Sequence, residues 1–326
     1  MKIAIVKLSA LGDIVHAMAA LQFIKKYNPK IEIDWIVEES FKELISANHH
    51  INQVHTVNIK NIKKSKSIRL LIIEIKKIRN FGPYDLVIDA QGLLKSSIIS
   101  RFIRSNYRFG FDRKSIREPI ACAFYNRKVY VDYEKNTIDR MIELLCFPFN
   151  IKVSKKELIE KEKFLYSKSN FPIPKQPYLL FVVGSTWESR NYPKEKFLEL
   201  AEKLQKKCFV IWGTDEEKNV SDWLCNKSKY INPLSKMSLS DLIVIIEHAQ
   251  LVIGNDTGPT HMAWGLNTPS ITLFGPTPIS RVFQTPFHKV LKSNSKVDQF
   301  NLNKDDFSIN EIKVNDIVKM ALEILE

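Results

Sequence analysis

Short apolar runs alternate with longer helical patterns from one end of the chain to the other. Runs such as 1–7, 84–89 and 251–255 are bounded by turn residues and are followed by stretches with apolar residues every three or four positions. A strand covered on both faces reads as a continuous apolar run, and parallel strands need crossover helices between them. The alternation therefore predicts an α/β protein made of successive strand–helix units with parallel sheets.

The same periodicity places the individual elements. Ile31, Ile33, Trp35 and Val37 alternate along one run and are expected on one face of a strand. Strands are predicted at 1–7, 31–38, 84–89, 128–131, 178–183, 209–213, 251–255 and 270–274. Helices are predicted at 13–27, 67–80, from about 93, 137–146, 193–207, from 215, 239–249, 258–264 and 314–325.

A change of character near the middle divides the chain. The charged run KKELIEKEK is followed by FPIPKQP, which holds three prolines, and a rigid extended connector is expected there. With 326 residues the chain is long enough for two domains. We expect one domain over 1–165, a linker over 166–177 and a second domain over 178–326.

The formal net charge of +13 indicates either an acidic partner or a general bias toward lysine. Nucleotide phosphates, an anionic membrane surface and nucleic acid are the candidate partners. The basic residues are scattered, and aromatic residues do not interleave with them as stacking platforms would. Nucleic acid is therefore not expected as a partner.

Cysteine usage and hydropathy point to a cytoplasmic protein without a spanning helix. The four cysteines form no C-x-x-C pair and are expected to be reduced, mostly buried thiols. No signal peptide is recognised at the start. The most apolar stretch, 242–254, is interrupted by Glu247 and His248 and is too short to span a bilayer. Any membrane contact would be peripheral.

The segment KLSALGDIVH, residues 7–16, directly follows the first predicted strand. Ligands gather at the carboxyl ends of parallel strands, where helix N–H groups face the crevice. Gly12 permits a close backbone approach, while Asp13 begins the next helix. On spacing alone, an N-cap is the commoner reason for Asp13. The loop lacks G-x-G-x-x-G, which argues against a nicotinamide or flavin enzyme.

A second loop, GNDTGPTH at 254–261, follows the strand LVI. Asp256 stands at the strand's end, and Thr257 and Gly258 begin a helix whose free N–H groups and dipole suit a diphosphate. His261 lies one turn further on. An aspartate cap of an ordinary turn is the alternative, but the cluster of Asp, Thr, Gly and His favours a functional site.

A third loop, GSTWESRNYP at 184–193, follows the first strand of the second half. Ser185 and Thr186 offer hydroxyl and N–H groups, and Arg190 offers a fork for phosphate or carboxylate. Taken alone, Arg190 reads as a solvated residue before a helix. The loop is therefore weak evidence by itself.

Two further segments lie in the first half. In DAQGLLKS, 89–96, a strand ends in aspartate and Lys95 begins the next helix. DRKSIREP, 112–119, is a basic loop that suits an acidic acceptor. Metal-site spacings, a G-x-S-x-G elbow and a P-loop are all missing from the sequence, so no metal or cofactor is expected.

These five segments, in this order, resemble the ADP-heptose:lipopolysaccharide heptosyltransferases over nearly the full length. WIVEESF at 35–41, REP and FYNRK within 117–128, and KMSL at 236–239 extend the similarity. The resemblance implies a GT-B architecture, with two Rossmann-like domains facing a central cleft. The N-terminal domain would bind the acceptor and the C-terminal domain the nucleotide sugar. The final helix would then pack back onto the first domain.

The implied reaction is inverting transfer of L-glycero-D-manno-heptose from ADP-heptose to the first Kdo of Kdo2-lipid A, in lipopolysaccharide inner-core biosynthesis. The implied location is the cytoplasmic face of the inner membrane, with peripheral contact. Two alternatives stay open: transfer to a later inner-core heptose, and a non-catalytic nucleotide-sugar-binding protein.

The resemblance also implies roles for individual residues. Asp13 would be the catalytic base. The diphosphate would be bound by Ser185, Thr186, Arg190, Thr257 and Gly258. The rest of the donor would be contacted by Asp256 at the heptose, His261 at the donor loop, Met237 at adenine and Glu217 or Glu216 at ribose. The acceptor would meet Gly12, Lys95, Arg113 and Arg117. The family commonly has lysine where this chain has Arg190, which changes the geometry but keeps the charge.

Overall fold

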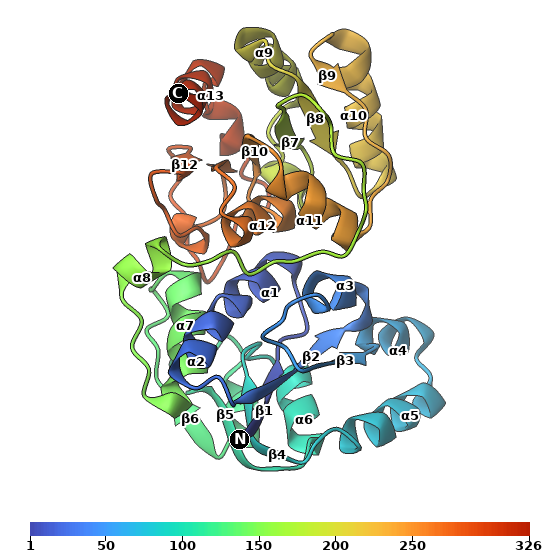
Figure 1. The fold of residues 1–326 in the computed structure, drawn as a ribbon, viewed down its shortest axis with the longest axis vertical. Helices are drawn as coiled ribbons and strands as arrows, with labels where there is room; N and C mark the ends of the chain where they lie inside the picture. The colour runs from blue at the N-terminus through green and yellow to red at the C-terminus, as the bar shows by residue number, and fades with distance from the viewer. The chain divides into compact units, whose positions relative to one another are not determined.

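The computed structural model describes residues 1–326, and the chain divides into two compact units, Met1–Tyr166 and Ser167–Glu326 (Figure 1). The expected linker, 166–177, begins at this division. Each unit is built around one six-stranded parallel sheet. Two α/β units with parallel sheets confirm the predicted fold class. None of the helices combines the length and apolar character needed to cross a bilayer.

The sheet of the first unit has the strand order β3-β2-β1-β4-β5-β6. Its direction of winding reverses between β1 and β4, which makes that pair the topological switch point. The strands are β1 (Lys2–Val6), β2 (Glu32–Glu38), β3 (Gln53–Val57), β4 (Tyr84–Asp89), β5 (Ser105–Phe111) and β6 (Arg127–Val129). The helices are α1 (Leu11–Met18), α2 (Ala20–Tyr27), α3 (Lys42–Ile45), α4 (Ile59–Ser65), α5 (Ile68–Arg79), α6 (Leu94–Phe102), α7 (Thr137–Cys146) and α8 (Lys155–Ile159).

The second unit repeats the same topology, with the order β12-β11-β10-β7-β8-β9. Its switch point lies between β7 and β10. The strands are β7 (Leu179–Val182), β8 (Cys208–Ile211), β9 (Ile231–Asn232), β10 (Leu251–Asn255), β11 (Ser270–Phe274) and β12 (His288–Lys292). The helices are α9 (Lys194–Leu204), α10 (Asp215–Lys227), α11 (Leu239–Glu247), α12 (Gly258–Leu266) and α13 (Val314–Leu325).

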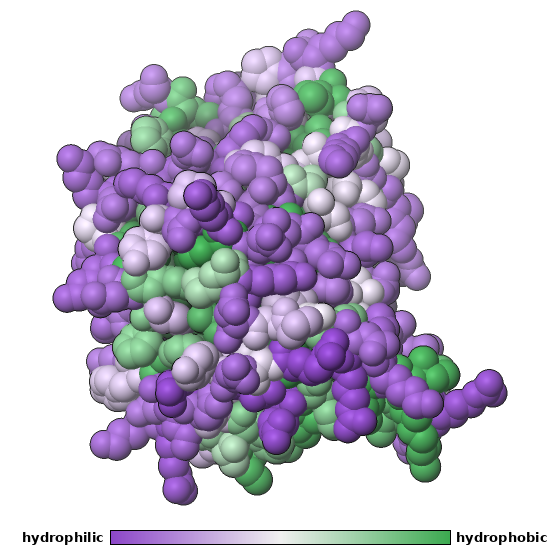
Figure 2. Space-filling view, turned by 60° about the horizontal axis from the view of Figure 1, so that its bottom comes forward, coloured by the Kyte–Doolittle hydropathy of each residue, from purple (hydrophilic) through white to green (hydrophobic).

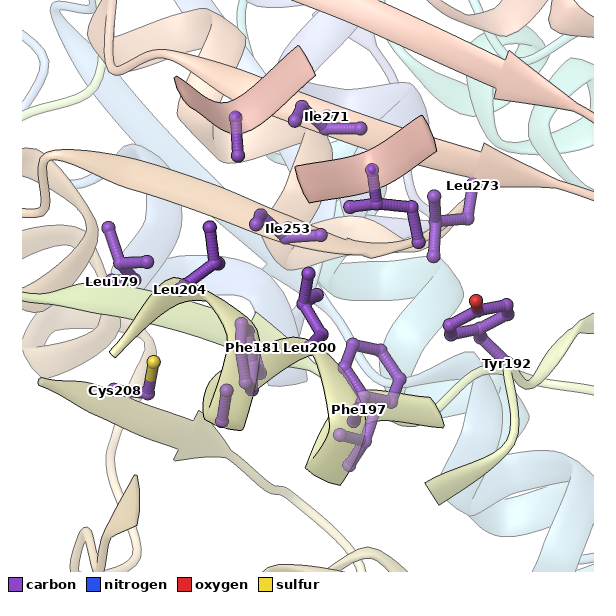
Figure 3. Close-up of a cluster of buried hydrophobic side chains, with 14 of the residues drawn as sticks. Leu179, Phe181, Tyr192, Phe197, Leu200, Leu204, Cys208, Ile253, Ile271 and Leu273 are labelled. Atoms are coloured by element: carbon purple, nitrogen blue, oxygen red, sulfur yellow. The ribbon is translucent and has the colours of Figure 1, made fainter. Parts of the chain in front are cut away.

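The core of the second unit shows why apolar periodicity located its elements so well (Figure 3). Phe181 and Ile253 come from neighbouring strands β7 and β10, and they pack with Phe197 and Leu200 of α9 on one face of the sheet. All four side chains are fully buried. The α13 residue Ile317 belongs to the same cluster, so the last helix covers its own unit's sheet.

Several boundaries differ from the sequence expectations. The predicted helix 13–27 is two helices, α1 and α2, which begin two residues earlier at Leu11 and are separated at Ala19. Strand β2 is buried on both faces. On its second face the Asp34 carboxylate accepts a hydrogen bond from the Tyr84 hydroxyl and contacts the His55 ring. Part of the charged run expected to be an extended connector is helix α8.

The capping chemistry explains that helix. The Ser154 hydroxyl accepts the N–H of Glu157, whose carboxylate accepts the N–H of Ser154 in return. Such a reciprocal pair provides hydrogen-bond partners for two N–H groups that are otherwise unpaired at a helix start.

Strands β3, β5, β9 and β12 were not predicted. The thiols of Cys122, Cys146 and Cys208 are buried, and all four cysteines are free, as expected.

Candidate active site

Four of the five loops singled out in the sequence follow the two strands at each switch point. In the first unit, β1 and β4 are hydrogen-bonded neighbours with Val6 beside Asp89, so the loops at 7–16 and 89–96 leave the sheet together. In the second unit, β7 and β10 pair with Val182 beside Gly254. The loops at 184–193 and 254–261 therefore share one sheet edge. Crevices at such positions are where open parallel sheets bind ligands.

Asp13 lies in the first turn of α1 and is not the N-cap of the helix. Ala10 is the N-cap, and its N–H donates to Asp13 Oδ2 over 3.3 Å. The N-cap interpretation of Asp13 is therefore wrong: the residue occupies the third helical position. The aspartate is half-buried, and Gly12 beside it is buried within the same turn. The Asp13 carboxylate therefore lies where the β1–α1 loop enters the helix.

Two residues that sequence reasoning missed join the loops of the first unit. Gln91 Oε1 accepts the N–H groups of Leu8 and Ser9 at 3.1 and 3.0 Å. Lys7 Nζ donates to the Ala90 carbonyl at 3.0 Å. Burial lowers the pKa of Lys7, while the charges of Asp13 and Asp89 act against that change. The signal was available, because Lys7 directly follows β1 and Gln91 is the second residue after β4.

Asp89 organises the β4–α6 loop from inside. Its Oδ1 accepts the N–H groups of Gln91 and Gly92 at 2.9 and 3.2 Å, and its Oδ2 accepts the Tyr125 hydroxyl at 2.7 Å. Because the carboxyl is fully buried, its pKa is raised above the usual range, although these hydrogen bonds oppose the rise. Asp89 therefore shapes the loop and, being fully buried, is not accessible to a ligand.

The three basic residues expected at the acceptor are all exposed. Lys95 lies in the first turn of α6, whereas Arg113 and Arg117 lie on the loop after β5. Glu118 Oε2 accepts the N–H of Leu94 at 2.7 Å and so ties that loop to the start of α6. The structure thus brings Lys95 and the basic loop to the same edge of the first unit.

Asp256 is the centre of a buried polar cluster in the second unit. The residue is only 1% exposed. Oδ1 lies 2.9 Å from His261 Nε2, and Oδ2 accepts from Arg190 Nη2 and the Thr277 hydroxyl, each at 2.9 Å. Arg281 Nη1 lies 3.8 Å from Oδ2. Both oxygens of Asp256 are therefore occupied within the protein.

The environment fixes the ionisation of this carboxylate. Burial alone would raise the pKa of Asp256, but the hydrogen bond from His261 and the positive charge of Arg281, His261 and Arg190 outweigh it and hold the pKa below its usual range. Burial lowers the pKa of Arg190, and Asp256 opposes that change. The cluster thus contains a buried ion pair that joins the loop at 184–193, through Arg190, to the loop at 254–261, through Asp256.

The N-terminus of α12 lies next to this cluster. Thr257 is the N-cap and has an extended backbone, and no side chain caps the helix. The alternative of an aspartate cap is therefore wrong. Gly254 lets β10 approach β7 here, since an added Cβ would lie 2.5 Å from Val182 Cβ. The half-buried Thr257 and Gly258 present the first turn of α12 to an anion.

The β7 loop lies beside that turn. The Ser185 hydroxyl donates to the Trp187 carbonyl at 2.8 Å, and Thr186 is exposed. Arg190 is only 8% exposed, and its guanidinium donates to both the side chain and the main-chain carbonyl of Asp256. The half-exposed Arg281 is the more accessible cation, and sequence reasoning missed it. It follows β11 in the segment GPTPISR, a signal that was present.

Three candidates for the nucleoside lie further along the same sheet edge. Glu217 Oε2 accepts the N–H groups of Gly213 and Thr214 at 2.6 and 3.2 Å, and its carboxylate lies over Gly184. Glu216 is exposed to solvent. Met237 is half-buried and precedes Ser238, the N-cap of α11. The Glu217 carboxylate therefore already accepts two hydrogen bonds at the start of α10.

The side chains of this chain form no group of three or more His, Cys, Asp and Glu that could hold a metal ion.

Comparisons with known proteins find relatives in sequence and in fold. The model for glycosyltransferase family 9 (heptosyltransferase) matches residues 75–304. The chain is 38% identical to lipopolysaccharide heptosyltransferase 1 of Campylobacter coli, over 99% of each chain. It is 31% identical to lipopolysaccharide heptosyltransferase 1 of Escherichia coli K12, over 85% of this chain and 88% of that one. Among solved structures it is similar to Escherichia coli heptosyltransferase WaaC with ADP, at 26% identity and a TM-score of 0.83, covering 99% of this chain and 100% of that one.

Proposed function

This chain belongs to glycosyltransferase family 9, the heptosyltransferases, and from that premise we propose a specific reaction for it. It is a glycosyltransferase with the GT-B fold, and it is 38% identical over its length to a lipopolysaccharide heptosyltransferase 1. It transfers L-glycero-D-manno-heptose from ADP-heptose in building the lipopolysaccharide inner core, and the proposed acceptor is the first Kdo of Kdo2-lipid A. The observation that carries the proposal is the uncapped N-terminus of α12 beside the Arg190–Asp256 pair.

That arrangement suits the diphosphate of a nucleotide sugar. N–H groups and the helix dipole at the start of α12 favour negative charge, and Ser185 and Thr186 add donors from the neighbouring loop. Since Arg190 is buried against Asp256, its contribution is positive charge behind the loop. Arg281, which faces the same carboxylate and is more exposed, is positioned to meet a phosphate directly.

Asp256 was expected to contact heptose hydroxyls, and that role stays a prediction. Its contacts favour a different role, because His261, Thr277 and Arg190 occupy its oxygens. In this role Asp256 positions Arg190 and His261 around the donor loop. Glu217 as the ribose ligand likewise stays a prediction, since its carboxylate already receives two N–H groups.

On the acceptor side, Asp13 is the proposed base. The acceptor hydroxyl attacks the anomeric carbon from the face opposite the diphosphate, and the bond to the β-phosphate oxygen breaks with its electron pair leaving on ADP. The hydroxyl proton passes to Asp13 as the new bond forms, when that proton has become acidic. ADP leaves with charge that the α12 N-terminus and the cations stabilise, so no general acid is needed. The product has inverted configuration.

The remaining proposals concern conditions and place. We propose that the reaction needs no metal or cofactor, so activity should survive EDTA. Lys95, Arg113 and Arg117 offer positive charge for the acceptor's carboxylates and phosphates. We further propose that the protein works at the cytoplasmic face of the inner membrane by peripheral contact, because its lipid acceptor resides in a membrane.

A transfer assay read by mass spectrometry tests the reaction. The enzyme is incubated with ADP-heptose and either Kdo2-lipid A or an acceptor that already carries heptose. One added heptose on Kdo2-lipid A supports the proposal, and transfer to the heptosylated acceptor alone contradicts it. No transfer together with retained ADP-heptose binding would indicate the non-catalytic alternative.

The variant Asp13→Asn tests the base. We expect kcat to fall by about 10²–10⁴-fold with ADP-heptose binding kept, since positioned general bases contribute that much. The exposed Asp132 in the same unit supplies a matched control, and Asp132→Asn should keep full activity. Undiminished turnover in Asp13→Asn would remove Asp13 from this role.

A further inference from the structure

Helix α5 has an outer face that is both apolar and cationic. Ile68, Leu71, Ile72 and Ile73 are 73%, 42%, 49% and 51% exposed, although most apolar side chains of this length are buried elsewhere in the chain. Figure 2 shows green side chains gathered beside purple ones at the lower right, where Figure 1 places α5. A cluster of exposed apolar residues on one helix marks an interaction surface.

The charges on and around α5 have one sign. Arg69, Lys76 and Arg79 are exposed on the helix. The stretch 59–79 contains eight lysines and arginines and a single acid. That acid, Glu74, is buried and lies 3.3 Å from Lys77 Nζ. Within residues 59–79, no exposed carboxylate therefore offsets the positive charge.

A basic groove continues this surface beyond the end of α5. The groove has a volume of about 530 Å³ and is lined by Arg79, Arg101, Phe102, Ile103, Arg104 and Arg108. The Arg79 guanidinium lies over the Phe102 ring at 5.3 Å and so joins helix and groove. Arg108 is held by the carbonyls of Ser100 and Ile103, whereas Arg101 and Arg104 are exposed. Residues 93–111 contain no acid at all.

We propose that α5 and this groove form the surface by which the protein lies on an anionic lipid bilayer. Ile68 and Ile72, which lie one turn apart on the same side of α5, enter the boundary between headgroups and acyl chains, and Arg101 and Arg104 bind lipid phosphates. An interfacial helix combines an apolar face with flanking Lys and Arg in this way. The proposal rests on the proposed function, which places the acceptor in a membrane, and names the surface that meets it.

A bilayer fits these observations better than a macromolecular partner. Nucleic acid would find no aromatic side chain on α5 on which its bases could stack. Binding it would also leave the exposed isoleucines in water, so their burial would contribute nothing. An acidic protein surface could pair with the cations, but its charged groups would not remove the exposed isoleucines of α5 from water. A bilayer supplies phosphates and an apolar layer together, in the plane of one helix about 18 Å long.

Vesicle sedimentation tests the surface separately from catalysis. Binding is measured to phosphatidylcholine vesicles with and without about 30 mol% phosphatidylglycerol. Wild type should bind the anionic vesicles, and the binding should weaken as salt rises. The double variant I68S/I72S should lower the vesicle partition coefficient at least about tenfold. The matched control I159S/I173S removes two isoleucines that are 54% and 43% exposed elsewhere, and it should bind as wild type does.

The cations are tested in the same way. R101Q/R104Q should lower binding roughly tenfold or more, since each cation near an anionic surface strengthens binding about fivefold. K227Q/K229Q, which removes two exposed lysines from the other unit, should leave it unchanged. Thermal unfolding of every variant checks that the fold is intact.

Several results would overturn the proposal. I68S/I72S binding as tightly as wild type is one, and an equal loss in I159S/I173S is another. A wild-type dimer that I68S/I72S converts to monomer without lipid would show that a second copy covers the face instead. Transfer to a de-acylated, water-soluble acceptor is measured alongside. Failure there with normal vesicle binding would refute the proposed function and leave this surface standing, and the reverse result would do the opposite.

Discussion

Replacing Asp256 by Asn probes the buried cluster that supports the donor loop. Asp256 is 1% exposed, and its carboxylate receives hydrogen bonds from Arg190, Thr277 and His261. An amide keeps the shape but carries no charge, and its NH2 group faces a donor. Arg190 is then left buried without its counter-ion. Breaking a buried ion pair from one side destabilises by about 3–5 kcal/mol.

The expected loss can be measured as heat or urea stability of the second unit. In a unit of this size each kcal/mol moves Tm by about 2–4 °C, so D256N should melt roughly 10 °C lower than wild type. The exposed Asp305 provides a control, and D305N should stay within about 0.5 kcal/mol of wild type. In a double-mutant cycle, Arg190→Met should destabilise wild type more than it destabilises D256N, by at least about 1.5 kcal/mol.

The pH dependence gives an independent check on the charge. The folded-state pKa of Asp256 lies below its usual range, so the stability it contributes is present above about pH 4, the ordinary aspartate pKa, and is lost as pH falls toward the lower folded value. The difference between wild type and D256N should therefore shrink below about pH 4. A D256N protein within 0.5 kcal/mol of wild type at pH 7, or a difference independent of pH, would refute the reasoning.

Three further variants test other parts of the structure. Burial lowers the pKa of Lys161 to about 7. The unfolded chain therefore binds more protons than the folded one between about pH 7 and 10.5, so wild-type stability is lost as pH falls through that window. Lys161→Met should be more stable than wild type by about 2–5 kcal/mol in urea titrations at pH 7, and the gain should vanish near pH 10. A loss of stability at pH 7 would contradict this. Gly254→Ala should destabilise by about 1–3 kcal/mol, because its Cβ would lie 2.6 Å from the Val182 carbonyl oxygen, whereas Gly213→Ala, whose Cβ meets nothing closer than 3.6 Å, should change stability little; equal effects in thermal unfolding would argue against the close approach. Arg281→Gln should raise KM for ADP-heptose about tenfold with a smaller change in kcat if its guanidinium meets the diphosphate, and an unchanged KM would exclude that contact.

The sequence by itself determined the strand–helix alternation, and its strongest elements were located closely. Strands β4, β10 and β11 and helices α7 and α13 have the predicted bounds, because each is a continuous apolar run or a clear amphipathic stripe. Strands β3 and β12 escaped because they lie at the sheet edges, where one side of the backbone is unpaired and the side chains are only partly covered. Their sequences mix polar and apolar residues and are not the continuous apolar runs by which buried strands were recognised.

The candidate site was found in part for the same reason. Loops rich in Gly, Asp and Thr after buried strands identified 7–16, 89–96, 184–193 and 254–261, and the resemblance supplied roles for their residues. Neither source could foresee the partners of those residues. Arg281 and Gln91 lie in loops far along the chain from Asp256 and Leu8, and only the strand order brings them into contact.

Tertiary structure also decided which polar groups face a ligand and which face the protein. In both sheets the chain reverses its winding direction between adjacent strands, β1 with β4 and β7 with β10, and this places two of the candidate loops at one sheet edge. Local sequence cannot encode that adjacency, because pairing between strands about 80 residues apart depends on how all the helices cover the sheet. Asp256 and Arg190 looked like ligand residues in the sequence; burial made them each other's partners.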